Sequence, residues 1–208
     1  MPQSRTPMFV GFAIVAMVLG AWSSQFFHSD PPLILNNGTL LQPTRPVERF
    51  QLVNHQGQPF SDTQLTGHWS LLFFGYTNCP DICPTTLTML AQVKKLLIGL
   101  PALQQPQFIF ISVDPARDTT TQLDKYIRFF DEHFIGLTGE QSQLDQLTKS
   151  LGAPVIIQKQ SELQYTVDHA ANLFLINPKA KLTAIFSPPH TTSTLADDLR
   201  KIIQGNTP

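Results

Sequence analysis

The chain has 208 residues, and 42% of them are hydrophobic, which is enough for one domain of ordinary size with a full core. The formal net charge is −1 and the pI is about 6.6, so no basic surface is indicated and we expect no nucleic-acid partner.

The N-terminal segment carries no Asp, Glu, Lys or Arg between Arg5 and Asp30. Its apolar run, residues 8–27, has about the 20 residues needed to cross a bilayer. We therefore predict that residues 1–30 form a single transmembrane anchor. A cleaved signal peptide is the alternative, because Ala21-Trp22-Ser23 fits a small-x-small cleavage site. Either interpretation places the rest of the chain outside the cytoplasm.

Residues 31–47 contain four prolines and one charged residue, Arg45, which predicts an extended linker. The domain itself is then expected to span residues 48–208. Apolar runs predict strands at residues 50–53, 69–76, 108–113, 172–176 and 182–186. Helical patterns predict helices from Pro84 to Leu97 and at residues 119–130, 141–151 and 195–203. Buried strands alternating with helices, with a hairpin near the C-terminal end, indicate an α/β fold.

Cys79 and Cys83 are the only cysteines, and they lie at the turn from a predicted strand to a predicted helix. A disulfide between them would stabilise the fold weakly, by about 2 kcal/mol against about 4.7 kcal/mol for a loop of 100 residues. The pair is better suited to redox cycling or to a soft metal, and its placement is thioredoxin-like. A metal would need a third ligand from elsewhere in the chain.

Histidine is the first residue type to consider for that ligand. The contexts of His55, His68 and His133 predict solvated surface side chains, and His190 follows Ser187-Pro188-Pro189 in a loop. His169 directly precedes a predicted core strand, which in a thioredoxin-like fold runs beside the cysteine loop. Two thiolates and one imidazole suit Cu(I), or Cu(II) or Zn(II) with one more ligand. A hydrogen-bonded strand-end histidine is an equally good interpretation of the spacing alone.

Several motifs together resemble the Sco/SenC family of copper-binding cytochrome c oxidase assembly proteins. They are FFGYTNCPDICPTTL at residues 73–87, ISVDPARDT at 111–119, GLTG at 136–139 and VDH at 167–169. The resemblance runs from about residue 48 to 203. It implies a thioredoxin-like fold, a central mixed sheet flanked by helices, behind one membrane anchor. It also implies copper bound by Cys79, Cys83 and His169, and a role in maturing the binuclear copper centre of oxidase subunit II.

The sequence departs from the family pattern at Asn78, where many relatives carry His, so a weak extra ligand or proton relay is expected to be missing. The stretch at residues 187–190 is similar to that of bacterial members. We therefore expect a single-pass protein of the bacterial inner membrane, with its domain facing the periplasm.

Four aspartates near the motifs have simpler interpretations beside functional ones. Asp114 can end a strand and Asp118 can cap the next helix. Asp81 can tune the thiolates or contact a partner, and Asp168 can orient His169.

The leading prediction is a copper metallochaperone that binds copper and passes it on without turnover. A thiol–disulfide oxidoreductase that keeps a partner's cysteines reduced is the alternative enzyme, and a redox or copper sensor stays open. A peroxiredoxin-like peroxidase fits the paired cysteines poorly, and a structural zinc site would lack a fourth ligand.

Overall fold

The computed structural model describes residues 33–153, 155–159, 165–169 and 171–205, together with Met17 and Trp22. The chain divides into two compact units, Met1–Ile34 and Leu35–Pro208. The predicted anchor, residues 1–30, lies outside the described residues except for Met17 and Trp22, which are both helical. Among the helices of the described residues, none combines the length and the apolar character needed to cross a membrane.

The second unit is built on a mixed sheet of eight strands in the order β1-β10-β9-β4-β5-β6-β2-β3. The central strands β4, β5 and β6 are parallel, whereas β9, β10 and β1 add to one side antiparallel and β2 and β3 to the other. The strands are β1 (Gly38–Pro46), β2 (Gln51–Asn54), β3 (Pro59–Ser61), β4 (Ser70–Gly75), β5 (Gln107–Ser112), β6 (Ile135–Thr138), β9 (Leu173–Asn177) and β10 (Lys181–Phe186). A separate hairpin pairs β7 (Val155–Lys159) with β8 (Tyr165–His169).

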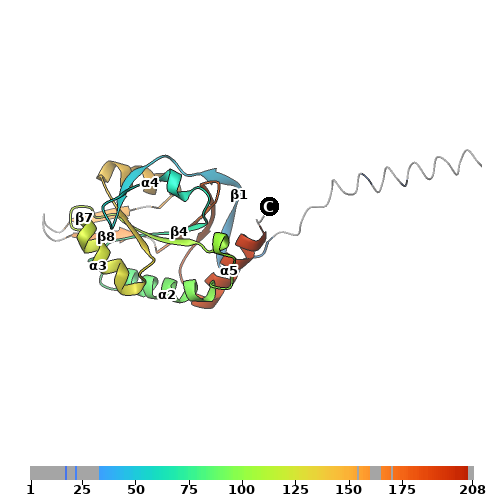
Figure 1. The fold of residues 1–208 in the computed structure, drawn as a ribbon. Coiled ribbons are helices and arrows are strands. Elements are labelled where there is room, and N and C mark those ends of the chain that lie inside the picture. Colours follow the sequence, from blue (N-terminus) through green and yellow to red (C-terminus); the bar gives the residue numbers. More distant parts are fainter. Residues whose placement is uncertain are drawn as a thin grey trace, which may run out of the picture. The chain divides into compact units, whose positions relative to one another are not determined.

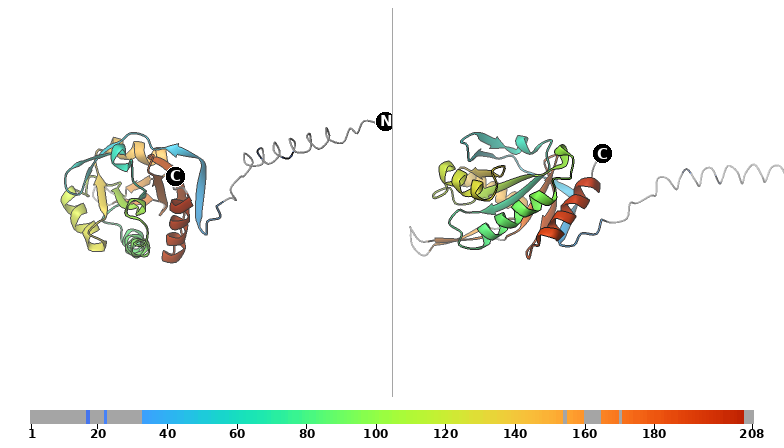
Figure 2. Two further views of the ribbon diagram at one scale, coloured as in Figure 1. Left: turned by 45° about the vertical axis from the view of Figure 1, so that its right-hand side comes forward. Right: turned by 60° about the horizontal axis from the view of Figure 1, so that its bottom comes forward.

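Helices cover both faces of the sheet, as Figure 1 shows. The α-helices are α2 (Ile82–Leu96), α3 (Thr120–Phe130), α4 (Gln141–Leu151) and α5 (Thr192–Gly205), and the short 3-10 helices are η1 (Asp62–Leu65) and η2 (Ala102–Gln104). Leu71 and Phe73 of β4 pack into one core with α2, α3 and α5. Leu72 and Phe74 point to the other face and pack into a second core with α4. In Figure 2, α2 is seen end-on with α5 beside it on the first of these faces.

The predicted mixed α/β sheet with flanking helices is confirmed, and so are most of its elements. Helix α3 is capped by Thr119, whose Oγ1 accepts the N–H of Gln122 at 3.2 Å. Helix α4 ends at Gly152, which adopts φ 69° and ψ 35°, a left-handed conformation that glycine reaches without strain. Helix α2 begins two residues earlier than expected, which places Pro84 at its third position.

The proline-rich stretch that the sequence assigns to a linker forms strand β1 over most of its length. Gly38–Pro46 pairs antiparallel with β10, and the register shifts between Leu40 and Arg45. An edge strand tolerates Pro43 and Pro46 because prolines there remove few ladder hydrogen bonds. The linker prediction is therefore wrong for residues 38–46, whose prolines belong to an edge strand. The folded unit begins near Leu35.

Candidate metal centre

The two cysteines lie together where β4 gives way to α2. Cys79 is half-buried in the connecting loop, and Cys83 is the second residue of the helix with 0% exposure. The N–H of Cys83 donates to the Sγ of Cys79 at 3.4 Å, and the N–H of Cys79 donates to the carbonyl of Tyr76 at 3.2 Å. No disulfide joins Cys79 to Cys83 in this arrangement. The predicted pairing of two thiols at a strand-to-helix turn is thus present in the fold.

Gly75, the last residue of β4, forms part of the packing beneath Cys83. A Cβ built on Gly75 would lie 2.8 Å from the Sγ of Cys83 and 2.6 Å from the ring of Phe110. Real side chains do not approach this closely, so any larger residue would displace the sulfur or the ring. The glycine of the sequence motif is therefore explained by close approach to the thiol.

Asp118 holds the start of the cysteine loop. Its buried carboxylate accepts the N–H of Thr77 at 2.8 Å, the hydroxyl of Thr77 at 2.6 Å and the hydroxyl of Ser112 at 2.6 Å. Burial raises the pKa of this carboxyl, although the three hydrogen bonds oppose the shift. The interpretation of Asp118 as a helix cap is wrong, because Thr119 caps α3 and Asp118 ties the loop to β5.

A second acidic side chain supports the same loop indirectly. Asp114 follows the end of β5, is buried and forms an ion pair with Arg117. Its carboxylate therefore does more than end the strand. The guanidinium carbon of Arg117 lies 5.7 Å from the ring centroid of Tyr76, in a cation–π arrangement. The sequence analysis does not predict the supporting roles of Thr77, Ser112 and Arg117, although all three lie within the motif stretches at residues 73–87 and 111–119.

The two thiols differ in their chemistry. The hydrogen bond with the Cys79 side chain, followed by burial, raises the pKa of the Cys83 thiol above its ordinary value. A bound metal needs thiolate ligands, so loading the pair with metal releases protons. Cys79 is the sulfur that an approaching partner reaches first, because Cys83 has no exposed surface.

His169, the third predicted ligand, is the last residue of β8, opposite Val155 of β7. Its side chain lies outside the described part of the structure, as does that of Asp168. The chain then enters β9 at Leu173, which pairs with Phe73 near the carboxyl end of β4. Because β9 runs antiparallel to β4, the backbone after His169 meets the sheet at the end that carries the cysteine loop.

A pocket of about 350 Å³ joins these segments. Asp81 and Ile82, which lie between the two cysteines, line it together with Ala171, two residues after His169. Among the described side chains there is no group of three or more His, Cys, Asp or Glu that could hold a metal ion. The complete ligand set is therefore a proposal, taken up below.

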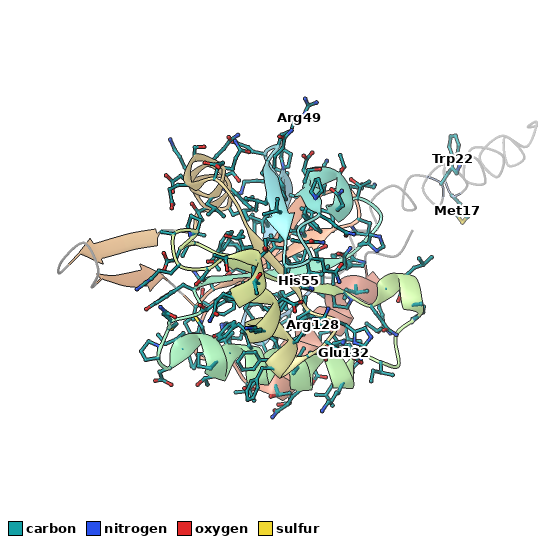
Figure 3. The ribbon with its side chains drawn as sticks, turned by 60° about the vertical axis from the view of Figure 1, so that its left-hand side comes forward. Met17, Trp22, Arg49, His55, Arg128 and Glu132 are labelled. Atoms are coloured by element: carbon teal, nitrogen blue, oxygen red, sulfur yellow. The ribbon has the colours of Figure 1, made fainter. Side chains whose placement is uncertain are left out.

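Three other histidines, His55, His68 and His133, differ in their burial. His68 and His133 are exposed, as predicted. His55 is buried, so its prediction as a surface residue is wrong. Its Nδ1 accepts the N–H of Gly136 at 3.2 Å, and burial lowers its pKa despite Asp124, whose Oδ1 lies 3.8 Å from Nε2. Figure 3 shows His55 close to Arg128 of α3.

Comparison with known proteins decides the family. A sequence profile described as SCO1/SenC matches residues 39–204. The chain belongs to the SCO1/SenC family.

Relatives within the SCO1/SenC family are similar along most of their length. The chain is 43% identical over 171 residues to a Stutzerimonas stutzeri protein named for copper binding, covering 81% of this chain and 82% of that one. It is 35% identical over 208 residues to the mitochondrial SCO2 homologue of Bos taurus, covering 96% and 76%. The crystal structure of Arabidopsis thaliana ScoI with copper bound has a TM-score of 0.70 at 30% identity, covering 76% and 98%. The SCO1/SenC match contains Cys79, Cys83 and His169.

Proposed function

We propose that this SCO1/SenC protein is a copper metallochaperone that binds copper through Cys79, Cys83 and His169. The observation that carries the proposal is the packed thiol pair, in which the N–H of Cys83 donates to the Sγ of Cys79 at 3.4 Å. Two soft sulfur donors at one turn favour Cu(I), and an imidazole completes a set that also accommodates Cu(II).

The relatives support copper as the cargo. The Stutzerimonas relative is named for copper binding, and the Arabidopsis relative was solved with copper bound. A Sco protein of the same fold is described as a member of a family of cytochrome c oxidase assembly proteins. We propose that the receiving partner is the copper-binding subunit II of the oxidase.

The proposed location follows from the predicted anchor. A single membrane pass through residues 1–30, with the domain in the periplasm of a bacterial cell, would hold the copper loop on the side where an oxidase copper site is filled. A signal peptide in the same residues would deliver the domain to the same compartment without the tether.

Anaerobic Cu(I) titration of the full-length protein in detergent, against a chelator of known affinity, tests the ligand set. The wild type should bind one Cu(I) per chain. His169→Ala should weaken binding at least tenfold, or about 1.4 kcal/mol, because one of three ligands is lost. Cys83→Ser should weaken it further, and His133→Ala, which removes an exposed imidazole, is the matched control. Equal affinity of His169→Ala and the wild type would remove His169 from the site.

A thiol–disulfide oxidoreductase is the second candidate, favoured by the accessible Cys79 beside the buried Cys83 at a helix N-terminus. In that reaction the Cys79 thiolate attacks a partner disulfide and releases one partner thiolate. Cys83 then loses its proton, attacks the mixed disulfide and releases the second, so the partner gains two electrons and the pair becomes a disulfide. A dithiol reductant must then restore the pair.

The effect of His169→Ala distinguishes the metallochaperone from the oxidoreductase. A reductase needs the two cysteines only, so His169→Ala should keep reducing a model disulfide peptide while its copper affinity falls. Retained reductase turnover combined with unaltered copper affinity would favour the enzyme. A copper or redox sensor would instead require a partner whose binding changes between the copper-loaded and the disulfide form.

A further inference from the structure

The loop between β10 and α5 ends in a histidine that the proposed copper site does not use. The Nε2 of His190 lies 2.7 Å from the carbonyl oxygen of Ala171. A carbonyl oxygen can only accept, so Nε2 carries the proton and donates it. Ala171 is two residues after His169, and the bond therefore fixes the backbone directly downstream of the proposed ligand.

The fixed segment lies beside the cysteine turn. His190 and Ala171 line the same pocket as Asp81 and Ile82, the residues between the two cysteines. Ala171 also packs against the hydrophobic core cluster that contains Cys83, and Cys79 packs against the same cluster. A displacement of Ala171 would therefore change the spacing between the His169 segment and the thiols.

The loop that carries His190 is itself held by a chain of exposed and part-buried hydrogen bonds. The side-chain amide of Asn37 donates to the carbonyls of Ser187 at 3.1 Å and Pro189 at 2.7 Å. The backbone N–H of Asn37 donates to the Asp198 carboxylate at 2.9 Å. Asp198 lies fully buried in α5 and also accepts the N–H of Asn36 at 2.8 Å. The loop is thus tied to a helix and to the beginning of β1.

We propose that His190 is a positioning residue for the copper site. It holds the backbone after His169, so that the imidazole of His169 can meet the two cysteines. This rests on the proposed function, since it assumes that His169 is a ligand. Groups that orient a metal ligand without touching the metal commonly change metal affinity by about 10–100-fold. Without the bond, the His169 segment must be ordered when copper binds, and that ordering lowers the affinity.

The test uses full-length protein in detergent and the same Cu(I) competition assay. His190→Ala should bind Cu(I) about tenfold more weakly than the wild type. His190→Gln should stay within about threefold of the wild type, because its amide N–H can replace the Nε2 donor. His68→Ala, which removes an exposed imidazole, is the matched control and should match the wild type.

A second variant acts on the loop without removing a histidine. Asn37→Ala deletes the amide that holds Ser187 and Pro189, and it should weaken Cu(I) binding in the same direction as His190→Ala. Unfolding midpoints of the copper-free variants, measured in parallel, allow affinities to be compared on folded protein. If His190→Ala fails to fold, His190→Gln and Asn37→Ala carry the comparison.

Spectroscopy of the Cu(II) form separates positioning from ligation. In the proposed role, His190→Ala keeps one nitrogen ligand and shifts the sulfur-to-copper absorption band, whereas His169→Ala loses the nitrogen. Two nitrogen ligands in the wild type and one in His190→Ala would make His190 itself a ligand and overturn the proposal. So would a Cu(I) affinity equal to that of His68→Ala, in a protein that still depends on His169. A wild type that binds no copper would refute the proposed function, and with it this inference.

Discussion

His55 shows how one buried residue makes stability depend on pH. Burial holds its pKa in the folded protein below the ordinary value of 6.5, and the neutral ring accepts the N–H of Gly136. As the pH falls below about 6.5, the unfolded chain therefore takes up a proton before the folded one does. As the pH is lowered from about 6.5, the free energy of unfolding should decrease until the pH passes the lower pKa of His55 in the folded protein. Below that pKa, His55 should cause no further loss of stability.

Substitution of this residue isolates its contribution. Urea unfolding of the copper-free protein between pH 7.5 and pH 5 should show a shallower loss of stability in His55→Gln than in the wild type. Each proton taken up only by the unfolded chain costs about 1.4 kcal/mol per pH unit. His133→Gln, which changes an exposed histidine, should keep the wild-type slope. Identical slopes for all three proteins would show that His55 titrates normally.

At the scale of elements, the end of β4 is the most constrained point. Gly75→Ala should lower the free energy of unfolding by about 1–3 kcal/mol, because the new Cβ would overlap both Phe110 and the Sγ of Cys83. Copper affinity should fall with it, because the sulfur must move. Gly99→Ala is the control, since a Cβ there meets no atom within 4 Å. Similar urea midpoints for the two variants would mean that the end of β4 relaxes without cost.

Strand β1 gives a second prediction at this scale. A chain that starts at residue 33 keeps Asn36, Asn37 and the whole of β1, whereas one that starts at Val47 loses the strand. The shorter chain should unfold at lower urea concentration, and the bared edge of β10 should promote aggregation that light scattering detects. Equal midpoints, without aggregation, would show that the folded unit begins after β1.

The same elements show what the sequence could predict. The strand β4 and the helices α3 and α4 were predictable because their signals are local: a doubly buried apolar run, a Thr119 cap and a Gly152 stop. Strand β1 was not, since its prolines are acceptable only at a sheet edge, and the edge is a property of the whole sheet.

The candidate site divides in the same way. The cysteines were predictable from their spacing, whereas the hold of Asp118 on Thr77 joins residues 41 positions apart and needs the fold. The burial of His55 likewise comes from its contact with the backbone of Gly136, 81 positions away.

At the scale of the whole molecule, the predicted anchor bears on delivery. A version exported without residues 1–30 should bind copper as tightly as the full chain, because the proposed ligands lie in the second unit. It should support oxidase assembly less well at matched abundance, because a tether confines both partners to one membrane surface. The measurement is oxidase activity in a deletion strain that carries either version. Equal rescue would show that anchoring is dispensable and would favour the signal-peptide interpretation.

The unequal burial of the two cysteines limits how oxidation can cross-link copies of the protein. Before it folds, each chain offers two reactive thiols, so successive chains could be linked into polymers of any length. After folding, Cys83 has no exposed surface and Cys79 is the single accessible thiol of a chain with only two cysteines. Covalent linkage between folded copies through Cys79 therefore ends at pairs and seeds no larger aggregate. A pair lasts until Cys83 of either copy attacks the bridge, closes its own Cys79–Cys83 disulfide and releases the other copy with a thiolate.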